Sequence, residues 1–462
     1  MTEREHVDVA VIGGGIGGLA LAHRLMQRQG TPCRVTVYER DVGARSRPQG
    51  FQIGLNPDGI NALRECCATE PDVLEALSSL FTRDSVQGFA MVDANLSPMM
   101  SFGVKKMADA VSSGLRSPSA FGGTVDRWRL RDILADSLKE SERGDGTRAG
   151  IVYGKQAVSY EITPTGAVQV RFSDGWDVTV DIVIGADGAN SKLRAIRTPS
   201  LEHRPIGVIN TGGFVAFDGK RFPKVNSAVF GDGKRPPHLV RAMSRNGVSV
   251  LMLPFRSPDN NMQLILGTTM PAPGGDAIAF IQEAGLDKGT AEPEVLRGRV
   301  KQLCLDAVKR AKFDQELITM YSEMDPSSVF DKFRNDLAII TPMKSNPFAT
   351  GNEHEGRVTL IGDALHAMTT HRGLGANTAL MDAADLGAAI ERAASSAGAS
   401  SNRISSIRSA ITAVEPKLAK RGFDNIRASL QSTNSMCLTG WKAMMRDAVI
   451  RCIGFVLWVL GK

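Results

Sequence analysis

The fold of this 462-residue chain is decided by residues 7–18, VDVAVIGGGIGG. The first six residues are mostly β-branched and aliphatic, a pattern typical of a strand buried in a parallel sheet. A glycine-rich turn follows at once, and residues 19–26, LALAHRLM, predict a helix. Residues 34–39, RVTVYE, predict a second strand. The sequence therefore predicts a βαβ unit with a right-handed crossover.

The glycines of this turn have the spacing G-x-G-x-x-G of a dinucleotide-binding turn. Gly13 permits the tight turn, Gly15 lets the backbone approach a pyrophosphate, and Gly18 lets helix and strand pack closely. The helix N-terminus then faces the phosphates with its partial positive charge. Glu39 ends the second strand, 39 − 18 = 21 residues beyond the last glycine, where a carboxylate binds ribose hydroxyls. An acid there favours FAD or NAD over NADP.

Two further motifs lie at the ends of expected strands. Residues 181–194, DIVIGADGANSKLR, place Asp187 and Gly188 after a buried strand. Residues 362–366, GDALH, are followed by residues 373–377, GLGAN, and by Asp382. An aspartate beyond a strand accepts hydrogen bonds from sugar-like hydroxyls, and a glycine-rich helix start offers N–H groups to an anion. Taken alone, each motif also fits a plain strand-to-helix turn.

The order of these segments predicts an α/β fold with a Rossmann-type FAD-binding domain assembled from discontinuous pieces. Strands of nucleotide-binding type return near residues 180 and 360, whereas residues 206–270 alternate like an antiparallel sheet. We expect FAD-binding segments at 1–80, 106–200 and 341–392, substrate-domain segments at 81–105 and 201–340, and a C-terminal helical region at 393–462.

The three motifs in this order resemble those of the group A flavoprotein monooxygenases, the para-hydroxybenzoate hydroxylase type, over about residues 7–390. The resemblance implies an oxidoreductase in which NADH or NADPH reduces FAD. O₂ then adds at the flavin C4a carbon, and the hydroperoxide donates oxygen to a small molecule. The expected reaction is hydroxylation or epoxidation of an electron-rich aromatic, indole or polyketide-like compound of secondary metabolism.

The resemblance also implies roles for individual residues. Gly13, Gly15 and Gly18 would hold the FAD pyrophosphate, Glu39 the adenosine ribose, and Arg127 the region near the ribityl chain. Asp187 and Gly188 would serve both FAD and the reductant, and Asp363 the ribityl chain or phosphates. Residues 373–377 would face the flavin pyrimidine edge. The full set of expected cofactor residues is Gly13, Gly15, Gly18, Glu39, Arg40, Gly50, Arg127, Asp187, Gly188, Gly362, Asp363, Gly373, Gly375, Ala376 and Asn377.

The chain departs from the family after the third motif. The usual segment there is proline-rich, whereas residues 367–372 read AMTTHR. His371 and Arg372 are therefore candidates to face the flavin or the substrate, with a solvent-facing role as the alternative. Gln52 is a further substrate candidate. No catalytic side chain is assigned, because the cofactor performs the difficult step.

Two other functions remain compatible with the motifs. A flavin-dependent halogenase uses the same scaffold, but none of the four tryptophans, at 128, 176, 441 and 458, sits in the W-x-W-x-I-P signature of that class. An FAD-binding protein without oxygen chemistry is the other alternative.

The composition argues against two classes of partner, nucleic acids and metal ions. The 55 Lys and Arg against 49 Asp and Glu give a net charge of +6 without a long basic run, which argues against nucleic acid. The six cysteines form no C-x-x-C pair, and no zinc-like spacing is present, so no metal is expected. The absence of a signal peptide or an 18-residue apolar run predicts a cytoplasmic protein, with membrane association through the C-terminus left open. We expect a monomer or a homodimer.

The C-terminal residues 441–462 mix basic side chains with bulky apolar ones. Two interpretations remain open: a last helix that docks its apolar side on the protein, or one that lies on a membrane surface. Residues 455–460 are apolar in every helical direction, so some must be exposed unless protein or lipid covers them.

Overall fold

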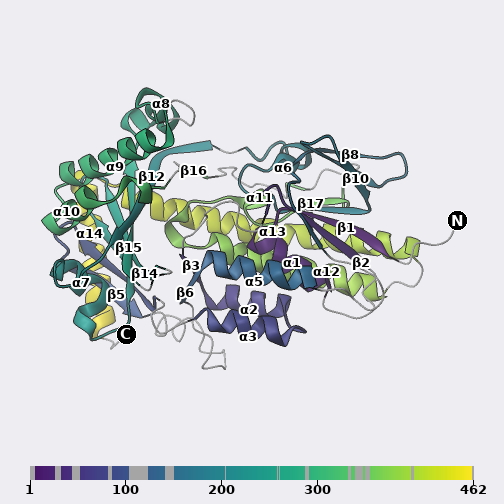
Figure 1. Cartoon of the computed structure of the whole chain (residues 1–462), viewed down its shortest axis with the longest axis horizontal. Helices are drawn as coiled ribbons and strands as arrows, with labels where there is room; N and C mark the ends of the chain where they lie inside the picture. The colour runs from purple at the N-terminus through teal and green to yellow at the C-terminus, as the bar shows by residue number, and fades with distance from the viewer. Residues whose placement is uncertain are drawn as a thin grey trace. The chain divides into compact units, whose positions relative to one another are not determined.

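The computed structural model describes residues 6–26, 33–43, 52–81, 86–103, 123–140, 150–202, 204–257, 259, 261–286, 291–330, 334–338, 347–348, 354–396 and 400–459. They belong to two compact units (Figure 1). Unit 1 comprises Met1–Phe81, Val125–His203 and Ile339–Ser429. Unit 2 comprises Thr82–Thr124, Arg204–Ala338 and Leu430–Lys462.

Unit 1 is built on a five-stranded parallel sheet in the order β17-β11-β1-β2-β7. Its strands are β1 (Val7–Ile12), β2 (Cys33–Tyr38), β7 (Gly150–Val152), β11 (Ile182–Gly185) and β17 (Val358–Leu360). Every residue of β1 and β11 is buried, as expected for central parallel strands. The α/β fold class is confirmed, since strands near residues 180 and 360 do join the first βαβ unit.

Helices pack closely on this sheet because small residues lie between them. Helix α1 (Ile16–Met26) contacts α12 (Gly375–Ser396), α2 (Pro57–Cys66) and α5 (Arg127–Glu140). A Cβ at Gly17 would lie 3.1 Å from the Cβ of Ala379, so the α1 backbone runs directly against α12. The remaining elements of unit 1 are β3 (Gln52–Leu55), α3 (Pro71–Ser79), the antiparallel meander β8 (Ala157–Ile162), β9 (Val168–Phe172) and β10 (Asp177–Val180), α6 (Lys192–Arg197) and α11 (Asp363–His366).

Unit 2 contains a seven-stranded sheet in the order β16-β12-β15-β14-β13-β4-β5. Its strands are β4 (Gly88–Asp93), β5 (Pro98–Gly103), β12 (Arg204–Ala216), β13 (His238–Met243), β14 (Ser249–Arg256), β15 (Met262–Pro271) and β16 (Arg334–Ala338). Neighbouring strands are antiparallel except for β4 and β13, which are parallel. The strands within residues 206–270 pair antiparallel, as their pattern predicts, and the parallel pair arises because β4 comes from a distant part of the chain.

One face of the unit 2 sheet carries the main core of that unit. Apolar residues of β13, β14 and β15, such as Val240, Met252 and Leu266, pack with Val300 and Met320 of the covering helices. These helices are α7 (Pro223–Phe230), α8 (Ala277–Glu283), α9 (Pro293–Arg310) and α10 (Gln315–Glu323).

The region 393–462, predicted to be helical, contains two long helices. Its first helix, α13 (Ser400–Met436), buries Ile407 and Leu418 within unit 1. Its last residue, Met436, instead packs with Met99 and Ile450 in unit 2. The region is divided because the apolar side chains of one long helix belong to two different cores. The final helix, α14 (Gly440–Val459), lies in unit 2.

We predict that Gly18→Ala lowers the free energy of unfolding by about 1–3 kcal/mol, the usual cost of overpacking. A Cβ at Gly18 would lie 2.2 Å from the Gly13 carbonyl oxygen, a backbone atom that cannot move aside cheaply. Urea unfolding measures the change. The matched control is Gly298→Ala in α9, where a Cβ meets no atom within 4 Å and no loss is expected. A Gly18→Ala protein as stable as the wild type would refute the close packing.

Candidate cofactor site

The turn between β1 and α1 joins three segments through backbone contacts. Gly13 has φ +117°, and a Cβ there would lie 2.3 Å from the carbonyl oxygen of Ala186, so only glycine fits. Its N–H donates to the Tyr38 carbonyl at 2.8 Å, and the Ala186 N–H donates to the Ile12 carbonyl at 2.8 Å. The ends of β1, β2 and β11 therefore meet at this turn, at the carboxyl edge where parallel sheets bind ligands.

Gly15 leaves the space above the N-terminus of α1 open. No atom lies within 4 Å of the position that a Cβ would take at Gly15, in contrast to Gly13 and Gly18. A phosphate can therefore approach the backbone there and receive hydrogen bonds from the first N–H groups of the helix. The close contacts at Gly13 and Gly18 and the open space at Gly15 are compatible with the pyrophosphate of a dinucleotide.

Glu39 is buried at the end of β2 and is held in place from both carboxylate oxygens. Oε2 accepts a hydrogen bond from the Gly14 N–H at 2.8 Å, and Oε1 accepts one from the Asp41 N–H at 2.9 Å. Arg131 donates through Nε to the Gly14 carbonyl at 2.8 Å and brings Nη2 to 3.5 Å from Glu39 Oε2. A carboxylate with two oxygens has further lone pairs, so Glu39 retains acceptors for ribose hydroxyls.

Arg131 is a residue of this site that the sequence motifs do not identify. It lies on α5, one helical turn beyond Arg127, the predicted cofactor residue, which begins the helix. The sequence offers one signal for Arg131: it directly follows Leu130, and both Leu130 and Leu134 are fully buried, so Arg131 lies next to the buried side of α5. The predicted residue Arg40 follows Glu39 and is exposed, and Gly50 lies outside the described residues.

Asp187 follows β11 and offers an unsatisfied acceptor. Its Oδ2 accepts a hydrogen bond from the Lys192 N–H at 3.0 Å, whereas its Oδ1 is buried without a hydrogen-bond partner among the described residues. Burial raises the pKa of this carboxyl group. At Gly188, φ is +82° and no atom lies within 4 Å of a Cβ position. A ligand hydroxyl that reached Oδ1 would complete its hydrogen bonding.

Asp363 lies beside the start of the 22-residue helix α12. Gly362 has φ +59° and turns the chain from β17 into α11, of which Asp363 is the first residue. The Oδ1 of Asp363 lies 3.6 Å from the position of a Cβ at Gly375, where α12 begins. The N–H groups of the first helical turn, including that of Ala376, have no acceptor within the helix. A carboxylate acceptor and positively polarised N–H groups thus converge at one place.

The side chain of Asn377 is occupied by the protein itself. Its Oδ1 accepts from the Asn56 N–H at 2.8 Å, and its Nδ2 donates to the carbonyls of Gly54 and Gly373, both at 2.9 Å. These bonds tie the β3–α2 loop to the start of α12. Backbone N–H groups of residues 375–377, rather than the Asn377 side chain, are therefore the groups available to a cofactor.

A buried ionic network holds the turn at Gly362 in place. His366 Nε2 lies 2.5 Å from Asp382 Oδ2, which also accepts from the Gly362 N–H at 3.0 Å. Arg421 bridges Asp382 and Asp385 with hydrogen bonds of 2.7 and 2.6 Å. Burial alone would lower the pKa of His366, but the Asp382 carboxylate outweighs burial and raises it. The network anchors the Gly362 backbone and so fixes the position of Asp363.

The three predicted substrate residues lie in different surroundings. Gln52 begins β3, and its Oε1 is buried without a hydrogen-bond partner among the described residues. His371 is partly exposed and Arg372 is exposed, both on the short helical turn Thr370–Arg372. Of the three, Gln52 has the feature expected of a ligand-binding side chain.

In unit 2, the sheet face opposite its main core is lined by aromatic and aliphatic side chains. The ring of Phe214 lies 5.1 Å from that of Phe255 and 5.2 Å from that of Phe330, measured between centroids. These partly exposed rings pack around the buried Leu253 and Ile265. The cluster offers both ring faces and ring edges for contact with other ring systems.

Comparison with known proteins links this geometry to oxygen chemistry. Residues 274–411 match the family described as FAD binding domain, and residues 11–54 match the NAD(P)-binding Rossmann-like domain. The chain is 26% identical to the monooxygenase cfoF of Aspergillus candidus, covering 83% of this chain and 84% of that protein. It is 26% identical to the FAD-dependent monooxygenase cctM of Talaromyces islandicus, covering 94% of each.

A relative with an additional activity matches over only part of its length. The dual O-methyltransferase/FAD-dependent monooxygenase elcB of Phaeosphaeria nodorum is 25% identical across 94% of this chain, which spans 46% of that protein. Among solved structures, Klebsiella pneumoniae HpxO complexed with FAD and uric acid aligns with a TM-score of 0.66 and 20% identity. The alignment covers 98% of this chain and 97% of that chain. CtdE in complex with FAD and a substrate aligns with a TM-score of 0.67 and 15% identity, covering 98% of each chain. These structures share the fold.

We predict that Gly15→Ala weakens FAD binding about tenfold or more while leaving stability without FAD unchanged. The added methyl group meets no protein atom, but it occupies the space through which a phosphate reaches the backbone. A contact cost of about 1–3 kcal/mol corresponds to roughly 5- to 150-fold in affinity. Fluorescence titration of FAD into the apoprotein measures the effect, with Gly298→Ala as control. Unchanged affinity would exclude Gly15 from the pyrophosphate site.

We predict that the stabilisation provided by His366 depends on pH. Because its pKa is raised in the folded state, the ion pair with Asp382 contributes fully below the unfolded value of about 6.5 and is lost as the pH rises through the folded value. The difference in unfolding free energy between wild type and His366→Asn should therefore shrink as the pH rises above about 6.5. Urea unfolding at a series of pH values on both sides of about 6.5 measures it.

Lys417→Gln provides the matched control. Lys417 donates to Asp385 at 2.7 Å, and although burial opposes ionisation there, Lys417 and Arg421 lower the pKa of that carboxyl group. This pair stays charged over the same pH range, so its contribution should be constant. A flat His366→Asn curve would show that His366 is not charged in the folded protein.

Proposed function

Because this chain belongs to the FAD-dependent flavoprotein monooxygenases, we propose that it transfers one oxygen atom of O₂ to an electron-rich small molecule, with NADH or NADPH as reductant. The observation that carries the proposal is the convergence of the open Gly15 turn, Glu39 and Asp363 at the carboxyl edge of one parallel sheet. Hydroxylation or epoxidation of an aromatic, indole or polyketide-like compound is the proposed reaction.

The residues of unit 1 fit FAD at both of its ends. The Gly15 turn would hold the pyrophosphate, and Glu39 would accept hydrogen bonds from the adenosine ribose. Asp363 would accept from ribityl hydroxyls, and the unsatisfied Oδ1 of Asp187 would accept a further ligand hydroxyl. When bound, FAD supplies electron transfer from the reductant and activation of O₂.

The protein's own contribution to rate is electrostatic positioning. The first turn of α12 directs its N–H groups and positive dipole end toward the space beside Asp363, which stabilises an anionic group placed there. The His366–Asp382–Arg421 network holds the adjoining backbone rigid. Donors fixed before the reaction need no reorganisation during it, which is the condition for electrostatic catalysis.

The aromatic face of the unit 2 sheet supports an apolar, ring-containing substrate. Phe214, Phe255 and Phe330 offer ring faces and edges within one cluster, and such contacts favour other aromatic systems. The partly buried side chain of Leu239 packs against the same cluster. The cluster offers apolar contact with few hydrogen-bonding groups, so we propose that shape and stacking select the substrate.

We predict that the FAD-loaded protein oxidises NADH or NADPH faster in the presence of a suitable phenol, indole or aromatic polyketide than in its absence. Under ¹⁸O₂, mass spectrometry should show one ¹⁸O atom in the product. Heat-denatured protein and unlabelled O₂ in H₂¹⁸O serve as controls. Oxygen derived from water, or a chlorinated product in the presence of chloride, would contradict the monooxygenase assignment. FAD binding without any NAD(P)H oxidation across the panel would indicate a non-catalytic FAD-binding protein.

A further inference from the structure

The last helix, α14, turns its apolar side outward. Its buried residues are Ala443, Arg446, Asp447 and Ile450, two of which are charged. Its large exposed side chains are Trp441, Met444, Met445, Val449, Ile453, Phe455, Val456, Trp458 and Val459. The exposed fractions reach 70% for Trp441 and 75% for Trp458. This arrangement is the reverse of a helix that docks its apolar side on the protein, which was one of the two interpretations of the sequence.

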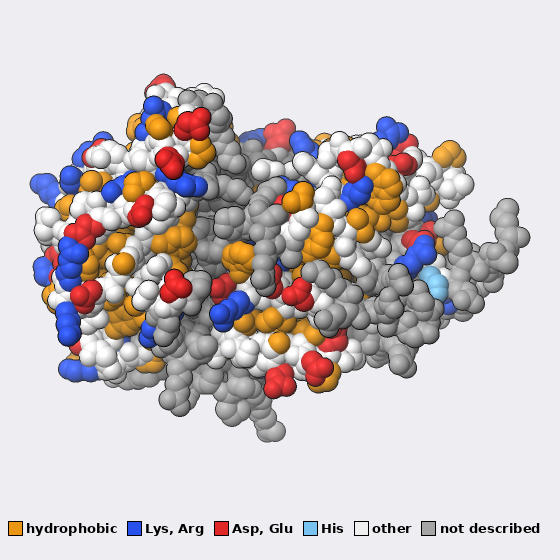
Figure 2. Space-filling model, viewed as in Figure 1, with side chains coloured by type: hydrophobic (Ala, Val, Ile, Leu, Met, Phe, Trp, Pro, Cys, Tyr) orange, Lys and Arg blue, Asp and Glu red, His pale blue; other side chains and the backbone are white. Residues whose placement is uncertain are grey.

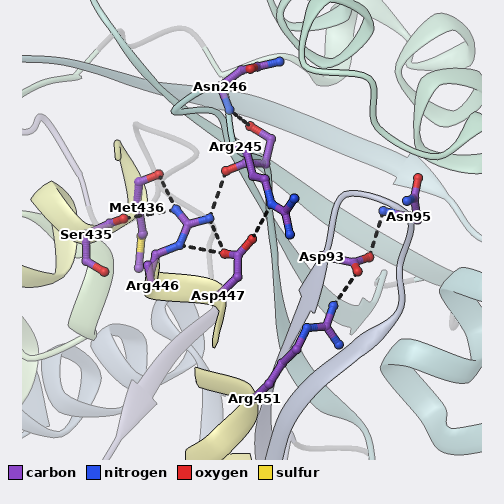
Figure 3. A network of polar contacts seen from close by, with 10 residues as sticks. Asp93, Asn95, Arg245, Asn246, Ser435, Met436, Arg446, Asp447 and Arg451 are labelled. Carbon is purple, nitrogen blue, oxygen red and sulfur yellow. Dashed lines mark hydrogen bonds and ion pairs between the residues drawn. The ribbon is translucent and has the colours of Figure 1, made fainter. Parts of the chain in front are cut away.

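Polar contacts on the inner side hold α14 in this orientation (Figure 3). Arg446 donates to Asp447 at 2.6 and 3.0 Å and to the carbonyl oxygen of Ser244 at 3.0 Å. Asp447 also accepts from Nε of Arg245 at 3.0 Å. Rotating the helix to bury its apolar side would take Arg446 away from the Ser244 carbonyl oxygen and Asp447 away from Arg245.

Hydrogen bonds and one close backbone contact hold the two ends of α14 as well. At the start, the Gly440 N–H donates to the Arg245 carbonyl at 3.0 Å. Toward the end, Arg451 bonds to Asp93 at 2.6 Å (Figure 3), and a Cβ at Gly454 would lie 2.3 Å from the Met99 carbonyl oxygen. The outward side is therefore presented by a firmly anchored helix.

Two basic residues lie close to the edges of the outward side. At about 100° per residue, the exposed apolar side chains span an arc of about 220°, and Lys442 and Arg451 each lie about 20° inside one of its two edges. The single acidic residue of α14, Asp447, is buried. Four cations (Arg245, Lys442, Arg446 and Arg451) stand against two carboxylates (Asp93 and Asp447), a balance of 4 − 2 = +2. Lys and Arg side chains also gather along the outer edge of unit 2 in Figure 2.

We propose that the outward face of α14 binds the surface of an anionic lipid bilayer, lying in the interface while the inner side stays attached to unit 2. Apolar side chains would enter the boundary between headgroups and acyl chains, and the marginal cations would contact anionic headgroups. Trp441 and Trp458 stand at the two ends of the face, and tryptophan favours this interface. Within the described residues, no helix is long and apolar enough to cross a bilayer.

The charge pattern favours lipid over a second copy of the chain. In a dimer formed through α14, Lys442 of each copy would lie at the interface without an exposed carboxylate of α14 to pair it, whereas Arg451 already pairs with Asp93. Like charges opposed across an interface cost affinity. An anionic bilayer offers both an apolar medium and compensating negative charge.

Co-sedimentation of the full-length, FAD-loaded protein with lipid vesicles tests the proposal. We expect binding at low salt to vesicles of phosphatidylcholine with phosphatidylglycerol, and much weaker binding to pure phosphatidylcholine or at high salt. Lys442→Gln should weaken binding to the anionic vesicles by about fivefold. Brominated lipids should quench the fluorescence of Trp441 and Trp458, which lie on the inserting face.

The double variant Phe455→Glu with Trp458→Glu should bind anionic vesicles more than tenfold more weakly. Two apolar side chains that would enter the bilayer are replaced by negative charges. Its melting temperature should not change, since both side chains are exposed. The matched control is Val295→Glu on α9, where the exposed fraction is 49% and binding should be unaffected. Two results would overturn the proposal: full-length protein that never sediments with anionic vesicles at low salt, or a wild-type dimer that the double variant separates.

Discussion

The close approach of Gly13 to the Ala186 carbonyl is the constraint on which unit 1 depends. Only a residue without a side chain allows β1 to end in the turn that places its backbone against the end of β11. That contact joins segments more than 170 residues apart, and it sets the strand order in which β11 separates β1 from β17. Glu39, Asp187 and Asp363 each follow one of these neighbouring strands, so their convergence at one edge follows from the sheet order.

The sequence predicts the parts of this arrangement that depend on local backbone requirements. Glycine spacing, β-branched strands and helix starts are each visible within a dozen residues, and the turn at Gly13 and the return of strands near residues 180 and 360 follow from them. Arg131, by contrast, acts through a carbonyl oxygen 117 residues away, and Arg421 reaches Asp382 from another helix. No short-range pattern records such contacts, because they depend on how helices pack.

Polar groups in unit 1 divide into those that the protein satisfies and those that it leaves for a ligand. The Asn377 amide makes three hydrogen bonds to backbone groups and acts as a brace. Asp187 Oδ1 and Gln52 Oε1 are buried without a hydrogen-bond partner among the described residues. An unmet buried acceptor costs about 1–3 kcal/mol. A ligand hydroxyl that reached either oxygen would recover that energy.

The orientation of α14 shows how a buried ion pair can override apolar patterning. Its sequence is apolar on nearly every side, so hydrophobicity alone specifies no single orientation, and the sequence left docking and membrane contact both open. Contacts from α14 to the rest of unit 2 remove this ambiguity, because Arg446 donates to the Ser244 carbonyl oxygen and Asp447 accepts from Arg245. These contacts form in the rotation of the helix in which Trp441, Phe455 and Trp458 face outward. The outward apolar face is a direct consequence of specific polar contacts, and this distinguishes it from a packing defect.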